Sequence, residues 1–228
     1  MKAVKITDRN IMFTKPTMYG WDLNLGLLIG DNRNYVIDTG VGRSSVRPVF
    51  DYLGNDKKPM VIINTHYHWD HVWGNWCFPD SMIISHSLCR VLIDKHWDED
   101  IEHNKQHVID GDVYKKLPNL VFLDKLYFPD DGVSIFHSPG HTKDCISIYD
   151  ERDSVLYAGD NIGDTDEEIL PVIDTDPGTF NRLLSLYDTY DFDVCISGHN
   201  KPQGRDVLKR MDIALYEYVR CCTHKFGM

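Results

Sequence analysis

Three histidines and one aspartate lie within six residues of the chain, at His66, His68, Asp70 and His71. They follow the short, β-branched run Val61-Ile62-Ile63, which predicts a buried strand that carries them at its end. If the chain stays extended through position 67, His66 and His68 point to the same side, because side chains alternate along a strand. Asp70 and His71 then lie where the chain turns into a helix. A single histidine after a strand is usually a core or surface residue, but this spacing favours two adjacent metal ions.

The motif His-x-His-x-Asp-His resembles that of the metallo-β-lactamase-fold superfamily of hydrolases. Three later segments strengthen the resemblance: Pro139-Gly140-His141-Thr142, the strand-like run from Ser154 that ends at Asp160, and Gly198-His199. The resemblance implies one metal held by three imidazoles, a second metal beside it, and a carboxylate between the two. The expected ligands are His66, His68 and His141 for the first metal, Asp70, His71 and His199 for the second, and Asp160 as the bridge.

The resemblance also implies the fold, an α/β chain arranged as a four-layer αβ/βα sandwich of the metallo-β-lactamase type. Local patterns agree with strands and helices in alternation. Residues 25–38 predict a hairpin, 44–53 a helix that crosses between strands, and 180–190 and 205–219 two further helices. We find no repeat, low-complexity tract or linker, so we expect a single domain over residues 1–228.

The chemistry that the resemblance implies is metal-dependent hydrolysis. Imidazole and carboxylate ligands suit zinc, and His68, where related di-iron proteins carry a glutamate, favours two Zn²⁺ per chain over iron. Two such ions roughly 3.5–4 Å apart lower the pKa of a shared water, and the bridging hydroxide is then the nucleophile. Asp70 is the expected catalytic residue, because one of its oxygens can bind a metal while the other orients the hydroxide and carries a proton.

The sequence narrows the class of substrate but does not identify the substrate. The motifs are most similar to the glyoxalase II-type and lactonase branches, so we expect a small ester, thioester or lactone. Asp160 stands where several true β-lactamases carry a cysteine, which speaks against β-lactams. Few residues follow His199, too few for the helical domain that binds glutathione. Two alternatives stay open: a mononuclear iron dioxygenase acting on persulfides, and a metal-binding domain without catalysis.

Composition narrows the class of partner. The formal net charge is −11 and the pI is about 5.3, so the surface repels phosphate backbones and nucleic acid is not an expected partner. No stretch approaches the length that spans a bilayer, so we expect no membrane association and a cytoplasmic location. The expected partner is a small-molecule substrate. The sequence does not indicate an oligomeric state.

Several other polar residues have both a structural and a functional interpretation. Asp38, in Asp38-Thr39-Gly40, either caps a turn or orients a metal ligand. We expect His86 to be a surface or capping residue and His137 to be structural. A helix is predicted over residues 87–97, and the region from His86 to His107, whose second part is strongly polar, is expected to cap the pocket. The charged run from Asp164 to Glu168 is expected to be a solvated loop that borders the pocket.

Overall fold

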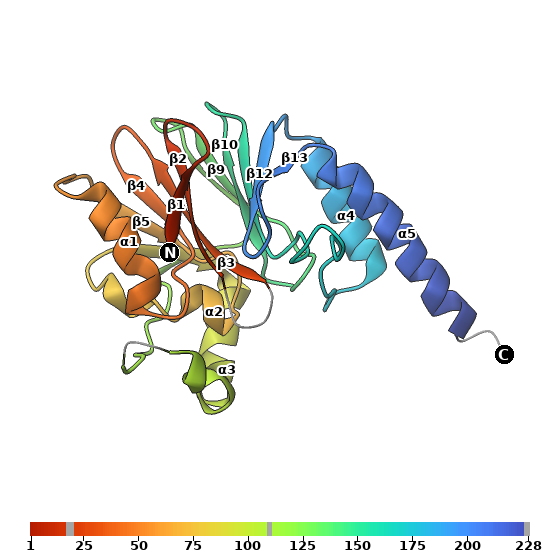
Figure 1. The fold of residues 1–228 in the computed structure, drawn as a ribbon, viewed down its shortest axis with the longest axis horizontal. Coiled ribbons are helices and arrows are strands. Elements are labelled where there is room, and N and C mark those ends of the chain that lie inside the picture. Colours follow the sequence, from red (N-terminus) through yellow and green to blue (C-terminus); the bar gives the residue numbers. More distant parts are fainter. Residues whose placement is uncertain (17–20, 109–110, 226–228) are drawn as a thin grey trace.

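The structure is a computed structural model that describes residues 1–16, 21–108 and 111–225. Two mixed β-sheets lie against each other at its centre, and helices cover the outer face of each sheet (Figure 1). The layers therefore run helix, sheet, sheet, helix, which confirms the expected α/β sandwich. In the described part of the chain, no helix is long and apolar enough to cross a membrane.

The first sheet has seven strands that neighbour one another in sequence order. The first four strands pair antiparallel, which confirms the predicted hairpin near residues 25–38, and the others continue in parallel. The strands are β1 (Lys2–Lys5), β2 (Asn10–Pro16), β3 (Asp22–Ile29), β4 (Asn34–Ile37), β5 (Met60–Ile63), β6 (Met82–His86) and β7 (Leu120–Phe122).

Parallel strands need a crossover between them, and helices provide it. The predicted helix at residues 44–53 is confirmed as α1 (Arg43–Leu53), which joins β4 to β5. After β5 come α2 (Trp69–Val72) and the 3₁₀ turn η1 (Asn75–Cys77). After β6 come α3 (Ser87–Asn104) and η2 (Lys105–His107), so this helix runs seven residues beyond the predicted end at 97.

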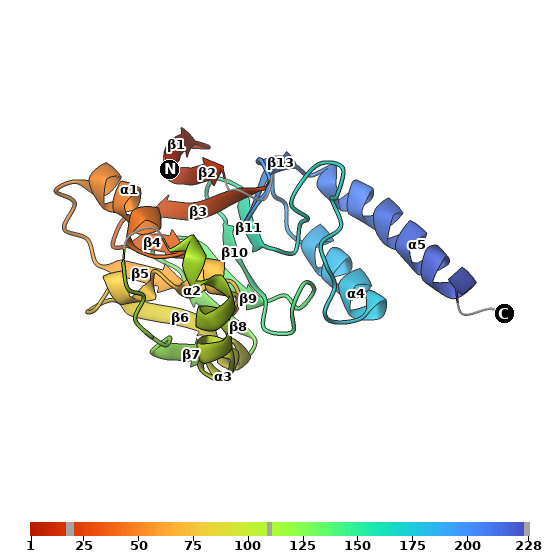
Figure 2. The ribbon, with the colours of Figure 1, turned by 60° about the horizontal axis from the view of Figure 1, so that its bottom comes forward.

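The second sheet has six strands in the order β13, β12, β11, β10, β9, β8. All neighbouring strands in this sheet pair antiparallel except β11 and β12. These two strands are parallel and are connected through α4. The C-terminal helix α5 packs beside α4 on the outer face of this sheet (Figure 2). The elements are β8 (Lys125–Phe128), β9 (Val133–His137), β10 (Ile146–Asp150), β11 (Val155–Gly159), α4 (Pro177–Asp188), β12 (Val194–Ser197), β13 (Gln203–Gly204) and α5 (Val207–Lys225).

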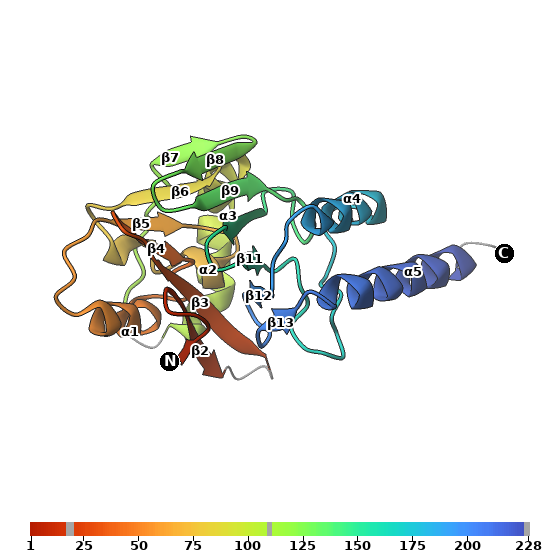
Figure 3. The same ribbon diagram turned by 90° about the horizontal axis from the view of Figure 1, so that it is seen from above.

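Apolar side chains fill the spaces between the layers. A central cluster joins the inner faces of the two sheets, with Tyr35 and Ile63 from the first and Ile135 and Tyr157 from the second, all buried. A second cluster packs α4 and α5 on the second sheet, a third packs α1 on the first sheet, and a fourth joins α2 to α3. The sheets are therefore held at a fixed distance from each other, which also fixes the position of the loops at their edge. Figure 3 shows the sheets and helices from above.

A buried carboxylate fastens the two sheets at another point. Asp131, in the β8–β9 turn, accepts hydrogen bonds from the Tyr35 hydroxyl at 2.7 Å and from the backbone N–H of Asp31 at 2.7 Å. Its Oδ2 also lies 3.3 Å from Nε of Arg33. Because Asp131 is fully buried, these partners replace the water that the charge has lost.

We predict that Asp131→Ala lowers the free energy of unfolding by about 3 kcal/mol, since it leaves buried donors and the Arg33 charge without their partner. Tyr35→Phe removes one hydrogen bond and should cost only about 1 kcal/mol. Asp8→Ala, at an exposed ion pair, is the control and should change stability by less than about 0.5 kcal/mol. Urea unfolding measures the free energy of unfolding of the three variants. Equal losses of stability in all three would contradict this role for Asp131.

Candidate metal centre

The seven predicted ligands lie together at the edge of the sandwich where β4, β5, β11 and β12 end. They form two adjacent groups, and within each group one potential ligand atom per residue lies within 4.8 Å of the others. The members are His66, His68, His141 and Asp160 in the first group, and Asp70, His71 and His199 in the second.

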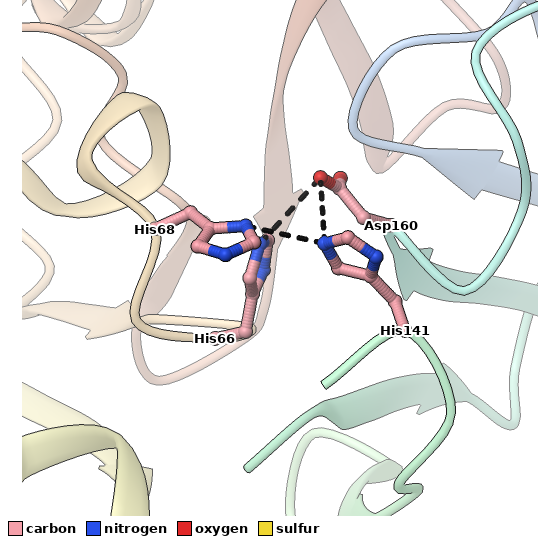
Figure 4. Close-up of side chains that lie close together, drawn as sticks. All are labelled: His66, His68, His141 and Asp160. Atoms are coloured by element: carbon pink, nitrogen blue, oxygen red, sulfur yellow. Dashed lines mark hydrogen bonds and ion pairs between the residues drawn. The ribbon is translucent and has the colours of Figure 1, made fainter. Parts of the chain in front are cut away.

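The first group brings three imidazole nitrogens to one point (Figure 4). Nε2 of His66 lies 3.0 Å from Nδ1 of His68, which lies 3.1 Å from Nε2 of His141. Nitrogens bound to tetrahedral zinc at 2.0–2.1 Å would be separated by about 3.4 Å, close to these distances. The group therefore has the size of a site for one small cation.

Asp160 lies between the two groups. Its Oδ2 is 3.2 Å from Nε2 of His199 and 3.3 Å from Nε2 of His71, both in the second group. The same oxygen is 3.5 Å from Nε2 of His66 in the first group. One carboxylate oxygen thus reaches both groups, as expected of a bridging ligand.

The outward nitrogens of two histidines are held by side chains. Nδ1 of His71 lies 2.8 Å from Oδ2 of Asp38, and a carboxylate can only accept, so His71 donates there. The Thr65 hydroxyl donates to the same carboxylate at 2.8 Å and accepts from Nδ1 of His66 at 3.1 Å. Each imidazole therefore turns the lone pair of its Nε2 toward the centre. Asp38 orients a ligand, and the interpretation as a simple turn cap is wrong.

Backbone carbonyls hold two further histidines in the same way. Nδ1 of His141 donates to the carbonyl of Val172 at 2.7 Å, and Nδ1 of His199 donates to the carbonyl of Asp22 at 2.7 Å. The Nε2 atoms of all four histidines consequently face one another and a carboxylate. A metal cation placed between them could accept a lone pair from each nitrogen.

A second observation supports the fit of a metal. Oδ1 of Asp160 is buried and has no hydrogen-bond partner among the described residues. A Cβ built on Gly198 would lie 2.1 Å from that oxygen and 2.7 Å from Cε1 of His71, so the backbone closes tightly behind the carboxylate. The donor set and the orphaned oxygen both fit Zn²⁺-type ions.

The electrostatic environment differs between the groups. Burial and neighbouring imidazoles lower the pKa of His66 well below its usual range and that of His68 to about 4, which keeps both neutral. Burial also lowers the pKa of His199, but the Asp160 and Asp70 carboxylates outweigh it and the pKa rises to about 9. Near neutral pH His66 and His68 are therefore ready to bind a cation, whereas His199 must first release a proton.

Several residues that the sequence did not predict as part of the site support these ligands. The side chain of Asn161 accepts the N–H of His141 at 2.9 Å and donates to the Ser138 carbonyl at 2.8 Å and to the Tyr187 hydroxyl at 2.9 Å. Its position directly after Asp160 was an available signal. The carbonyls of Val172 and Asp22 left no such signal, because every residue type carries one.

A cleft of about 520 Å³ opens beside the two groups. Its lining includes His68, Asp70 and His141, the ring of Trp21, and side chains from the second half of α3. The polar stretch that was expected to cap the pocket thus forms one of its walls. On the other side Asp164, expected in a solvated loop, is half-buried in the lining, whereas Asp166 to Glu168 are exposed.

Two further histidines, His86 and His137, have structural roles. His86 caps the N-terminus of α3 by accepting from the N–H of Leu88 at 3.3 Å, as expected, but it is buried and not on the surface. His137 stacks on His86 with ring centroids 4.0 Å apart and donates to the carbonyl of Lys143 at 2.8 Å. His103 and His107 belong to neither group of potential ligands.

Comparisons with known proteins agree with this site. Residues 19–199 match the model of the metallo-beta-lactamase superfamily. The acyl-coenzyme A thioesterase MBLAC2 of Bos taurus is 27% identical over 215 residues, which cover 82% of this chain and 76% of the relative. A probable metallo-hydrolase of Methanocaldococcus jannaschii is 30% identical over 166 residues, covering 66% of this chain and 72% of the relative.

Solved structures show the same fold. The structure of TMB-1 superimposes with a TM-score of 0.77 at 15% identity, covering 96% of this chain and 98% of that one. The metallo-beta-lactamase from Pontibacter korlensis has a TM-score of 0.74 at 19% identity, covering 94% and 98%. Fold and site together define a metal-dependent hydrolase. The chain belongs to the metallo-beta-lactamase superfamily.

We predict that loading the second group with Zn²⁺ releases at least one proton near neutral pH, because the pKa of His199 is about 9. Its apparent affinity should rise at least about tenfold per pH unit up to that value, whereas affinity at the first group should depend less steeply on pH, because the pKa values of His66 and His68 are lowered. Calorimetric titration in buffers of different ionisation enthalpy counts the protons. Equal proton release by the two groups would contradict the difference described above.

We predict that Asp38→Asn weakens metal binding at the second group about 10–100-fold, because His71 loses a charged acceptor. Asparagine is the better test than alanine, since Asp38 has φ of 60° and asparagine tolerates this conformation. Zinc competition with a chelator measures the affinity, and Asp8→Asn on the surface serves as the control. Unchanged affinity in Asp38→Asn would show that the carboxylate does not support the ligand.

Proposed function

We propose that the protein is a dinuclear zinc hydrolase of a small thioester, ester or lactone, with a thioester as the first candidate, and that residues 1–228 form one domain. The observation that carries this proposal is Asp160, whose single oxygen lies within 3.5 Å of imidazole nitrogens from both groups. Such an arrangement suits two ions that share one ligand.

Two ions held by these residues would supply a water of lowered pKa and would polarise the substrate carbonyl. The protein's own contribution is to position the side chains that act on this water. Oδ2 of Asp70 lies 3.4 Å from Nε2 of His199, and the side chain also lines the cleft. Asp70 makes no hydrogen bond to another described residue, so its second oxygen is free to accept a proton from an attacking water and to pass it to the leaving group.

The preference for thioesters comes from the relatives. MBLAC2 proteins are named acyl-coenzyme A thioesterases, and a matching protein of Aspergillus chevalieri is named an acyl-carrier-protein thioesterase, at 27% identity over 59% of this chain and 39% of that relative. Their shared chemistry is attack on an acyl carbonyl with departure of a thiolate. A site with a positioned carboxylate and room for a small substrate fits that reaction. The cytoplasmic location and the absence of a nucleic-acid partner stay predictions from composition.

Metal analysis is the first test. Protein purified without added metal should contain about two zinc ions per chain. One iron per chain would instead favour the persulfide dioxygenase, and fully loaded protein that turns over no ester, thioester or lactone would favour a non-catalytic metal-binding domain. The panel should include an uncharged thioester, such as S-butyryl-N-acetylcysteamine.

We predict that Asp70→Ala lowers kcat/KM about 10²–10⁴-fold, because the group that orients water and moves its proton is lost. One ion should remain at the first group, and affinity at the second should fall. Turnover, metal content and melting temperature are measured on one preparation. Glu102→Ala, at an exposed position of α3, is the control. If Asp70 only capped α2, the variant would lose about 0.5–2 kcal/mol of stability and keep its turnover.

A further inference from the structure

The walls of the cleft carry negative charge beyond the metal ligands. Glu99 and Asp100 of α3 line one side, and Asp164, which follows β11, lines the other. Among the described residues of the lining there is no lysine or arginine. The sequence at 17–20 and 109–110 contains no basic residue either. Low-dielectric walls that carry charge of one sign concentrate its field inside a cleft, so these carboxylates contribute a negative potential at the positions they line.

Two of these carboxylates lack partners. Asp100 and Asp164 are half-buried, and neither makes a hydrogen bond or ion pair with another described residue. Asp166, just outside this lining, is by contrast paired with Lys201 and Arg210. Burial, opposed in part by His96, raises the pKa of Asp100 to about 6. A buried carboxylate without a partner is unfavourable, and a cationic ligand would relieve that cost.

Aromatic rings complete the same surface. The Tyr67 ring lies between His68, at a centroid distance of 4.5 Å, and His96 of α3, at 5.5 Å. It therefore links the metal ligands to the acidic wall. Across the cleft, Trp21 packs against His199 with centroids 4.4 Å apart. Aromatic faces beside carboxylates are the usual recognition elements for ammonium groups.

We infer that the cleft selects a substrate that carries a positive charge of the ammonium type, held near Asp100 and Tyr67, and that it disfavours phosphate-rich leaving groups such as coenzyme A. This inference rests on the proposed thioester hydrolysis, in which water adds to the acyl carbon, the C–S bond breaks, and a carboxylate, a thiol and a proton are formed. The relatives named for coenzyme A substrates would then differ from this chain in the leaving group.

Three thioesters that share the same acyl group but differ in the charge of the leaving group test this inference. Butyrylthiocholine is cationic, S-butyryl-N-acetylcysteamine is neutral, and butyryl-coenzyme A is polyanionic. We expect kcat/KM to fall in that order, with the cation favoured about tenfold or more over the neutral compound at low salt, and the advantage reduced at high salt by screening. Equal rates for the three, or a preference for butyryl-coenzyme A, would overturn the inference and leave the proposed hydrolysis intact.

The Asp100→Asn variant tests whether the α3 wall of the cleft causes the preference for the cationic thioester. The ratio of kcat/KM for the cationic and neutral thioesters should fall about fivefold or more, because the variant keeps the shape of the side chain and removes its charge. Glu102→Gln is the matched control, since it removes a charge from the same helix at an exposed position outside the lining. Equal ratios in wild type and Asp100→Asn would contradict the role of Asp100.

Binding without turnover tests the inference separately. Choline and its uncharged isostere 3,3-dimethylbutanol have the same shape, so a calorimetric comparison on the zinc-loaded protein reports the charge alone. We expect choline to bind at least about tenfold more tightly, and the difference to shrink in Asp100→Asn. If none of the thioesters turned over, the proposed function would be wrong, but this comparison would still decide whether the cleft prefers a cation.

Discussion

The convergence of imidazole Nε2 atoms on Asp160 is the interaction on which the rest of the site depends. Four histidines donate their Nδ1 protons to fixed acceptors, so their Nε2 atoms are directed inward. The acceptors come from widely separated segments of the chain. A metal cation between these nitrogens could accept a lone pair from each once the second group has released its proton, and the fold has to hold every acceptor in place for the site to exist.

The contact between the sheets maintains that geometry. β3 of the first sheet reaches the end of β12 in the second through Asn24, whose side chain donates to the carbonyls of Ser197 at 3.0 Å and Asn200 at 2.7 Å. This places His199 from one sheet beside His71 from the other. Close packing allows no slack, because a Cβ on Gly26 would lie 2.5 Å from the Tyr157 ring. A shift of either sheet would therefore separate the ligands.

The layers and the grouping of the ligands were predicted through the resemblance to the metallo-β-lactamase-fold superfamily, and local signals agree with both. Strand-like runs end shortly before His66, Asp160 and His199, and strand ends at one edge of a layered sheet meet in space. The backbone acceptors at Val172 and Asp22 had no signal in residue type. The extension of α3 to Asn104 was also missed, since its exposed polar residues lack an apolar period and its helicity depends on packing near Trp97. That extension supplies the acidic wall, so the cleft was less predictable than the centre.

This difference between centre and cleft has a physical basis. Metal ligands must meet strict distance and lone-pair requirements, which restrict residue type and spacing, whereas a wall contributes through its summed field and many side chains can provide it. The acidic wall would also act differently on the two ends of the proposed reaction. It attracts metal ions and a cationic substrate, but it repels the carboxylate product, which carries the opposite charge. The same potential would then favour entry of a cationic substrate and departure of the carboxylate product.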